Sequence, residues 1–265
     1  MIKVENISAW GFEHAIRGMR NSLNSWDKSD SGVCGDFSVE YKDGQIGCDH
    51  KCPKWSPDNY CGYSERLQKF PYDYYMIGKN DLELMQKLYK GGSEHRKYLR
   101  QIFVSMDITA PLYWWKEFDT YKIGTVANSC STMHTIHRKE FELDDFSWDQ
   151  LLNNGCDLFE LQWGKDCSTK VQPQHFLIQY IIPVLNICRE KYLETKDKKY
   201  WWQMIQLLPS SYNQKRTVTM NYENVVNIIH QRSGHKLDEW NEFVETLKGL
   251  PYVKEIMIGG HNDGI

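Results

Sequence analysis

The chain has 265 residues, a formal net charge of −3 and 41% hydrophobic residues. These values are typical of one globular domain that buries a substantial core. The slight negative charge excludes the bulk positive field that attracts nucleic acid polymers, so we expect no such partner. No apolar run approaches the roughly 20 residues that cross a bilayer, and the first residues lack a signal-peptide pattern. We therefore expect a cytoplasmic protein with no membrane partner.

Hydrophobic periodicity and turn residues predict the secondary structure in chain order. We expect a strand at 2–7, a helix at 12–19, a hairpin at 37–47, helices at 81–89 and 94–101, a strand at 102–109, a helix at 112–118, a polar connection at 120–134, helices at 176–193 and 200–208, a strand at 216–220, and helices at 222–231 and 237–248. Because strands and helices do not alternate regularly, the pattern indicates an α+β fold rather than a doubly wound parallel sheet.

Several residues mark the expected boundaries of these elements. Asn80 or Asp81 suits the N-cap of one helix, and Asn221 suits the N-cap of another. Pro111 fits the first turn of the aromatic helix that follows it. Pro183 predicts a kink or a restart within the longest helical segment.

Residues 32–72 are interpreted as an insertion within a single domain that spans 1–265. This insertion holds four clustered cysteines, Cys34, Cys48, Cys52 and Cys61. Zinc favours four Cys or His ligands, so the cluster predicts a structural zinc site. The spacing lacks the paired C-x-x-C knuckles of strong zinc signatures, and free thiols on a surface insertion are the alternative.

Three stretches, at 107–118, 201–209 and 230–240, carry a family resemblance. Their order and spacing are similar to those of flavin-dependent thymidylate synthases, in a divergent branch associated with phages and Firmicutes. The resemblance covers roughly residues 81–250. It implies a mixed sheet flanked by helices and a homotetramer that binds a nucleotide and FAD between subunits. It also implies reductive methylation of dUMP, with NADPH and methylenetetrahydrofolate as co-substrates.

The family's arginine-rich signature falls on 120–133 of this chain. Lys122 keeps the positive charge of the second Arg, and Thr125 keeps the hydroxyl of the first Ser. Asn128 stands where Glu is usual, or matches the family's Asn if the register slips by one residue. No register restores the two remaining arginines, and Lys or Thr does not replace the donor fork that Arg offers to phosphate.

The segment at 128–132 offers small polar side chains that suit a ribose or a base edge. Its candidate ligand-binding residues are Asn128, Ser129, Cys130 and Ser131. Cys130 is also a candidate nucleophile, although reactivity requires a nearby cation or helix start.

Basic residues further along the chain complete the candidate site. The resemblance gives Arg232 contact with the flavin and matches Lys215 or Arg216 to a family arginine that follows a Leu-Pro turn. Together with Lys122 these residues predict an anion site, and four separate solvated cations are the alternative. His95 resembles the His of a Glu-His pair that the family places before the same strand, and a surface histidine is the alternative.

Tyr121 and four tryptophans are candidates for stacking on a flavin or a base. The tryptophans are Trp114, Trp115, Trp201 and Trp202. Adjacent residues point to different faces of a helix, so at most one of each pair lines a given site. We expect most of these rings in the core.

Three functions are consistent with the sequence. The first is flavin-dependent methylation of a uracil deoxynucleotide, or a related flavin reaction on a nucleotide, in a bacterial or phage-infected cell. The second is a non-enzymatic protein that binds or sequesters a nucleotide on the same frame, because the frame is retained while arginines are lost. The third is a structural or interaction protein, which no motif specifically favours.

Overall fold

The structure is a computed structural model that describes residues 2–33, 38–40, 46–48, 75–155, 158–162, 164–165 and 167–258, with the backbone alone at 38–40 and 46–48. Cys34, Cys52 and Cys61 lie outside these residues, and Cys48 is described only as part of a strand. The zinc site and the insertion at 32–72 in a single domain therefore stay predictions.

The chain divides into two compact units, each assembled from separate segments. Unit 1 consists of Met1–Val4, Asp107–Thr120 and Ala127–Thr217, and unit 2 consists of Glu5–Met106, Tyr121–Val126 and Val218–Ile265. No helix among the described residues is long and apolar enough to cross a membrane.

The described strands are short except for three. They are β1 (Lys3–Trp10), β2 (Gly32–Val33), β3 (Ser38–Glu40), β4 (Ile46–Cys48), β5 (Tyr75–Met76), β6 (Phe103–Pro111), β7 (Thr125–Ser129), β8 (Phe159–Gln162), β9 (Ser168–Val171) and β10 (Asn213–Asn221). The predicted hairpin is confirmed, because β3 pairs antiparallel with β4. The β8–β9 hairpin was not predicted from the sequence.

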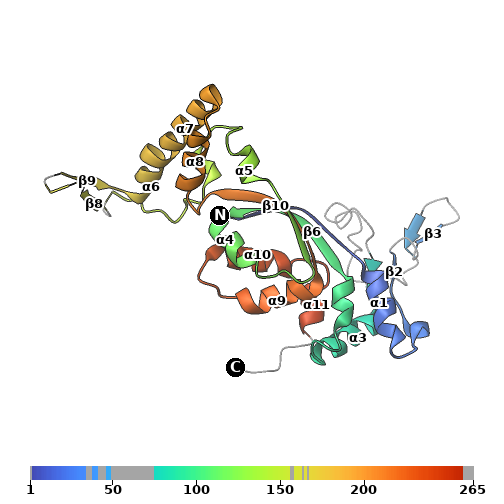
Figure 1. Cartoon of the computed structure of the whole chain (residues 1–265). Coiled ribbons are helices and arrows are strands. Elements are labelled where there is room, and N and C mark those ends of the chain that lie inside the picture. The colour runs from blue at the N-terminus through green and yellow to red at the C-terminus, as the bar shows by residue number, and fades with distance from the viewer. Residues whose placement is uncertain are drawn as a thin grey trace. The chain divides into compact units, whose positions relative to one another are not determined.

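Helices supply much of the remaining structure (Figure 1). They are α1 (Phe12–Asn21), α3 (Lys79–Lys90), α4 (Leu112–Phe118), α5 (Thr132–Thr135), α6 (Pro173–Phe176), α7 (Ile182–Thr195), α8 (Lys198–Leu207), α9 (Tyr222–Arg232), α10 (Asp238–Lys248) and α11 (Val253–Ile258). A π-helical turn at Leu177–Ile181 separates α6 from α7, and Pro183 lies in the first turn of α7, so the predicted restart is confirmed.

Strands β1, β6, β10 and β7 form a sheet in that order. The Leu112 N–H donates to the Tyr212 carbonyl at one end of the β6–β10 pair, and the Tyr222 N–H donates to the Ile102 carbonyl at the other end. Residue numbers therefore rise along β6 as they fall along β10, so this pair is antiparallel. The predicted α+β class is confirmed.

Strand β7 lies at the edge of this sheet and corrects one expectation. The segment 120–134 was expected to be a polar connection, but it contains β7 and the short helix α5. The Cys130 N–H donates to the Lys215 carbonyl of β10. Nearly every side chain of β7 is exposed, so the strand lacks the alternating pattern that identifies half-buried strands.

A second expectation was also wrong. A helix was expected at 94–101, but only a short 3₁₀ segment, Lys97–Gln101, forms there. Gly92 has a left-handed φ of 90° and ends α3 before this segment. Tyr98 and Leu99 are both buried although they are adjacent, which a tight turn achieves without an amphipathic helix.

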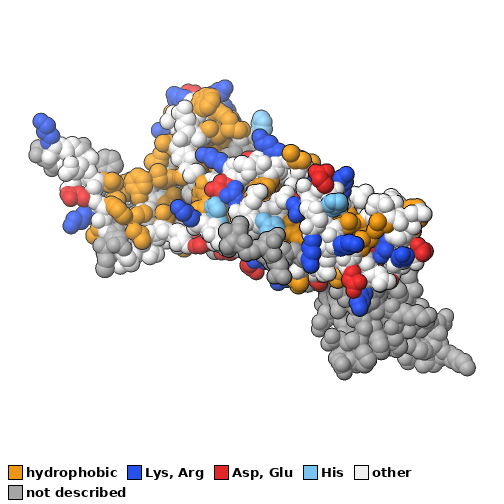
Figure 2. All heavy atoms as spheres, turned by 90° about the horizontal axis from the view of Figure 1, so that it is seen from below, with side chains coloured by type: hydrophobic (Ala, Val, Ile, Leu, Met, Phe, Trp, Pro, Cys, Tyr) orange, Lys and Arg blue, Asp and Glu red, His pale blue; other side chains and the backbone are white. Residues whose placement is uncertain are grey.

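Exposed hydrophobic side chains gather on unit 1. Figure 2 shows hydrophobic side chains over the region of α6, α7 and α8. The exposed ones on the π-turn and α7 include Ile178, Tyr180, Val184 and Ile187. Contiguous apolar surface of this kind marks interaction sites more often than scattered single residues do.

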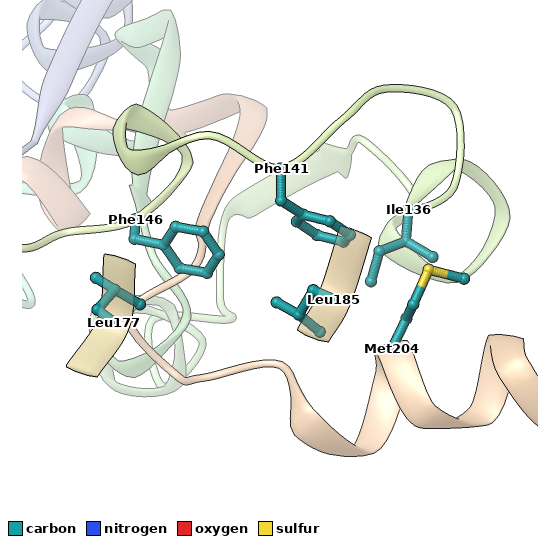
Figure 3. Close-up of a cluster of buried hydrophobic side chains, with 6 residues drawn as sticks. All are labelled: Ile136, Phe141, Phe146, Leu177, Leu185 and Met204. Carbon is teal, nitrogen blue, oxygen red and sulfur yellow. The ribbon is translucent and has the colours of Figure 1, made fainter. Parts of the chain in front are cut away.

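Unit 1 has its own core between its loops and the α7–α8 pair, which pack against each other. Figure 3 shows its six buried side chains, Ile136, Phe141, Phe146, Leu177, Leu185 and Met204. The Phe141 N–H donates to the Asn186 side chain of α7 at 2.8 Å, and the Asn186 amide donates back to the Phe141 carbonyl at 3.0 Å. These two bonds hold the loop against the helix.

The core of unit 2 lies between its strand segments and α9. Val104 and Met106 of β6 are fully buried, while the intervening Ser105 accepts a hydrogen bond from Thr219 of β10 at 3.1 Å. This alternation places one face of the strands in the core. Helix α9 begins at the predicted residue, because the Asn221 side chain accepts the Asn224 N–H.

Candidate functional site

The two cations predicted on β10 lie on opposite faces of the strand, because successive strand residues alternate. The Lys215 ammonium lies 3.3 Å from an Asp107 carboxylate oxygen, and the Thr217 hydroxyl donates to the other oxygen at 2.6 Å. Arg216 points to the other face, where it meets different partners. Only one of the two cations can therefore serve any single small site.

Arg216 is held on three sides within unit 1. Its guanidinium stacks on the ring of Trp115 at 4.2 Å, a ring that is 1% exposed. Its Nη1 donates to Asp119 at 2.7 Å, and its Nε donates to the Gln214 side-chain oxygen at 2.9 Å. Its Nη2 has no hydrogen-bond partner among the residues that the structure describes. The guanidinium is thus fixed in one orientation with an open edge.

Gln214 connects Arg216 to the candidate ligand-binding segment at 128–132. Its amide nitrogen donates to the Cys130 carbonyl at 3.0 Å and to the Thr132 hydroxyl at 3.1 Å. Asn128 and Ser129 end β7, Cys130 follows it, and all three are exposed. The structure therefore brings Arg216 and this segment together through Gln214, a residue that no sequence pattern indicated.

Among the residues that the structure describes, Cys130 contacts no cationic side chain that would mark it as a nucleophile. Its sulfur lies 3.7 Å from the Thr135 hydroxyl, and it precedes a helix of only four residues. A thiolate needs an adjacent positive charge or a long helix start for strong activation. A binding role through neutral hydrogen bonds suits the loop better.

A second group of candidates lies in unit 2 around Arg232. Its Nε donates to the Tyr121 hydroxyl at 3.0 Å, and the Tyr121 hydroxyl donates to the Gln231 side chain at 3.0 Å. Its guanidinium lies 4.6 Å from the ring centroid of Trp240, and its Nη1 lies 3.1 Å from His235 Nε2. Cation–π and hydrogen-bond contacts therefore fix this arginine before any ligand binds.

Lys122 and Thr125 flank a turn that α9 holds in place. The Asn224 amide donates to the Ile123 carbonyl and, at 2.8 Å, to the Thr125 hydroxyl. Gly124 has a φ of 72°, and a Cβ there would meet the Asn221 side chain. The Lys122 side chain is exposed, so the turn presents this cation to solvent while Thr125 is engaged inward.

His95 is exposed in the turn after α3, where its ring packs near Gly91. The neighbouring Arg96 forms the stronger polar cluster. Arg96 pairs with Glu223 at 3.0 Å and lies 5.3 Å from the ring centroid of Tyr89. One Glu223 carboxylate oxygen is buried without a partner in the described structure, and burial raises the pKa of Tyr89.

The predicted aromatic candidates separate into two groups. Trp114 and Trp115 are buried, as expected for core residues, and the ring of Trp115 packs against the guanidinium of Arg216. Trp202 is 42% exposed, and the Trp201 indole N–H donates to the Met133 carbonyl at 3.1 Å. Among the described residues, no group of His, Cys, Asp and Glu side chains is arranged to hold a metal ion.

Solved structures with the same overall arrangement give the family context. A thymidylate synthase X from Helicobacter pylori, crystallised with FAD and dUMP, matches with a TM-score of 0.55 and 16% identity, over 99% of this chain and 100% of that chain. A second structure of that bacterium's flavin-dependent thymidylate synthase, complexed with FAD and dUMP, matches with a TM-score of 0.54 and 15% identity, over 97% and 99% of the two chains.

A UMP/dUMP methylase, PolB from Streptomyces cacaoi, bound with 5-Br dUMP, matches with a TM-score of 0.51 and 14% identity, over 98% of this chain and 96% of that chain. No protein-family model matches the sequence, and the search of curated proteins found no match. The resemblance seen in the sequence is thus confirmed at the level of the fold: this chain has the fold of the flavin-dependent thymidylate synthases.

Proposed function

We propose that this chain is a flavoenzyme that methylates a uracil deoxynucleotide, dUMP to dTMP, or performs a related flavin reaction on a nucleotide. The observation that carries the proposal is the fold likeness, over nearly the whole chain, to structures that hold FAD and dUMP. FAD recharged by NADPH supplies the reducing chemistry, and methylenetetrahydrofolate supplies the carbon. The reaction takes place in the cytoplasm of a bacterial or phage-infected cell, because its substrates are soluble nucleotides.

The described side chains fit such ligands in two places. In unit 2, Arg232 and Tyr121 are held rigidly beside Trp240, which suits contact with a large planar or anionic cofactor. In unit 1, the exposed residues at the end of β7 and directly after it, Asn128, Ser129 and Cys130, and the open edge of Arg216 offer hydrogen bonds to a nucleotide. Fixed groups of this kind lose little conformational entropy when a ligand binds.

The first test is the visible absorption spectrum of the freshly purified protein. Bound oxidised flavin, or flavin taken up from added FAD, is the expected result, followed by bleaching on addition of NADPH and dUMP. A protein that stays colourless after incubation with FAD would contradict the proposal. Formation of dTMP in the presence of methylenetetrahydrofolate distinguishes methylation from a related flavin reaction.

One observation favours a second candidate, a non-enzymatic nucleotide-binding protein. Arg216 is paired with Asp119, and Lys215 is paired with Asp107. Carboxylates of the chain therefore already neutralise the two β10 cations that were predicted to bind an anion. A binder of this kind would take up a nucleotide without consuming NADPH. Nucleotide binding by calorimetry in a protein that never bleaches flavin would support this alternative over the enzyme.

We also propose that the chain assembles with further copies, as a homotetramer. The exposed apolar side chains at Tyr180, Val184 and Ile187 support this, since such a surface is stabilised by burial. Light scattering after size-exclusion chromatography tests the proposal. Ile187→Asp should lower the mass of the assembly, whereas the exposed, polar Gln206→Asp on α8 should not.

A structural zinc ion on the cysteine segment is a separate proposal, supported by ligand type alone. Metal analysis of the purified protein should give about one zinc per chain. Cys52→Ser should remove the zinc, and Cys167→Ser, which lies far from the cluster in the sequence, should not.

A further inference from the structure

Arg216 and Asp119 together present a mixed hydrogen-bonding edge. Arg216 Nη1 and an Asp119 carboxylate oxygen lie 2.7 Å apart, and neither group is saturated by this contact. A guanidinium has five N–H donors and a carboxylate has about four acceptor positions. The described residues use only two donor positions of Arg216, at Nε and Nη1. A donor and an acceptor therefore remain side by side.

The edge is rigid on its protein side and open on the other. Trp115 covers one face of the guanidinium, Gln214 holds Nε, and the Asp119 N–H donates to the Trp115 carbonyl at 2.9 Å at the end of α4. The Arg216 side chain is 15% exposed, whereas the Asp119 side chain is 52% exposed. The arginine is therefore buried up to its open edge, and the carboxylate stands at the surface beside it.

This edge is poorly suited to a phosphate group. The carboxylate neutralises the guanidinium, and it would repel an anion that approached Nη2. At short range such like-charge repulsion is substantial even with partial solvent screening. A neutral group with its own donor and acceptor meets no such penalty.

We infer that Arg216 and Asp119 recognise the imide edge of a neutral six-membered ring. The imide N–H donates to the Asp119 carboxylate, and the adjacent ring carbonyl accepts from Arg216. Uracil has this edge, and so does the isoalloxazine ring of a flavin. Cytosine presents a donor and an acceptor in the reverse order, so a cytosine ring held in the same orientation as uracil would be rejected. This inference rests on the proposed function, and it makes Asp119 a specificity-determining residue.

N3-methylation removes the imide donor and is the decisive probe. We would measure dissociation constants of the full-length protein for deoxyuridine, 3-methyldeoxyuridine and deoxycytidine by calorimetry, and for riboflavin and 3-methylriboflavin by flavin fluorescence. Methylation should weaken binding by about tenfold for the ring that occupies this edge, and the other ring should be insensitive. The two pairs of probes thus identify which source of the imide binds here.

Asp119→Ala removes the acceptor of the imide N–H, so it should remove the methylation penalty and reduce the preference for deoxyuridine over deoxycytidine. Asp144→Ala, which removes an exposed carboxylate of the same unit, is the matched control and should change neither the methylation penalty nor the preference. Circular dichroism and the melting temperature would establish that both variants fold.

Two results would overturn the inference while leaving the proposed function intact. One is a protein that binds FAD or dUMP but shows no loss of affinity on N3-methylation of either ring, or shows the same loss in Asp119→Ala. The other is an Arg216→Ala variant that loses affinity for dUMP and keeps it for deoxyuridine, since Arg216 would then hold the phosphate. A folded protein that binds neither FAD nor any of these nucleosides and nucleotides would instead reject the proposed function itself, and the inference with it.

Discussion

The side-chain oxygen of Gln214 accepts the Nε–H of Arg216 at 2.9 Å, while the amide nitrogen of Gln214 donates to the loop that contains Cys130. Gln214 and Arg216 share a face of β10 because they are two residues apart. The neutral amide of Gln214 therefore orients the Arg216 guanidinium without neutralising it. The same amide connects Arg216 to the exposed segment around Cys130.

Gln214→Ala should weaken nucleotide binding although it removes no charged group. The variant frees Arg216 Nε and releases the Cys130 carbonyl, and a lost hydrogen bond to a charged group corresponds to an affinity loss of about tenfold. Calorimetric titration with dUMP measures the effect. Gln206→Ala, at an exposed position of α8, is the matched control and should bind dUMP normally. Equal affinities in the two variants would exclude a positioning role for Gln214.

The charge at Arg232 should not be sufficient for ligand binding. Arg232→Ala should lower FAD affinity strongly, and Arg232→Lys should restore only part of it, because Lys cannot reproduce the planar contact with Trp240 and the fork that reaches Tyr121. Flavin fluorescence quenching gives the dissociation constants. Lys236→Ala, an exposed cation nearby in sequence, serves as the control.

If Arg232→Lys bound FAD as tightly as the unmodified protein, a simple electrostatic role would replace the planar one. If Arg232→Ala had no effect on FAD affinity, Arg232 would not be part of the FAD site. Unchanged melting temperatures are required in both cases, because Arg232 also contacts residues of its own unit.

Helix starts illustrate what sequence can and cannot predict in this chain. The start of α9 was predictable because its cap, Asn221, is local to the helix. The start of α3 was predicted with the wrong cap. The Asp30 carboxylate accepts the Asn80 and Asp81 N–H groups from 50 and 51 residues away, so Asp81 lies inside the helix instead of capping it. Helix propensity and capping patterns depend on neighbouring residues, so they cannot identify a capping side chain that is so far away in the sequence.

The candidate site shows the same limit. The sequence identified Arg216 as a cation that could bind a ligand, but not Asp119, which is 97 residues away along the chain and pairs with it. Strand β7 was missed because an exposed edge strand has no buried face to impose an alternating pattern. The family frame, in contrast, was recognisable because contiguous stretches carry it, such as 107–118, which forms the end of β6 and the helix α4.

Asp81→Ala should destabilise unit 2 severely. The Asp81 carboxylate is fully buried, accepts Arg20 Nε at 2.8 Å, and also accepts the Ser29 and Ser31 hydroxyls. Removing it leaves a buried guanidinium without its counter-ion, which costs about 3–5 kcal/mol of unfolding free energy. Urea denaturation followed by far-ultraviolet circular dichroism measures this cost.

Glu83→Ala on the same helix is the matched control. Its carboxylate is 62% exposed and pairs with Lys79 only at 3.9 Å, so the expected change is within about 0.5 kcal/mol. Similar losses in the two variants would mean that the buried pair contributes no more than a surface pair.

Tyr212 should make unit 1 sensitive to alkaline pH. Burial is the main cause that raises the pKa of Tyr212 from 10.0 to about 12, and the nearby Asp145 raises it further in the same direction. The folded state therefore favours the protonated phenol. This contribution to stability is complete below pH 10 and is lost as the pH rises through about 12, because the unfolded chain ionises first.

Tyr212→Phe tests this assignment, because Phe keeps the ring that packs on Phe141 and Phe146 but cannot ionise. Between pH 10 and 12 the unfolding free energy of the variant should fall less than that of the unmodified protein. The difference should equal the contribution of one titrating group. Tyr180→Phe, at an exposed position of the π-turn, is the matched control for the loss of a hydroxyl. Urea unfolding at a series of pH values provides the comparison. Identical slopes for Tyr212→Phe and the unmodified protein would show that Tyr212 ionises without cost, as an exposed phenol does.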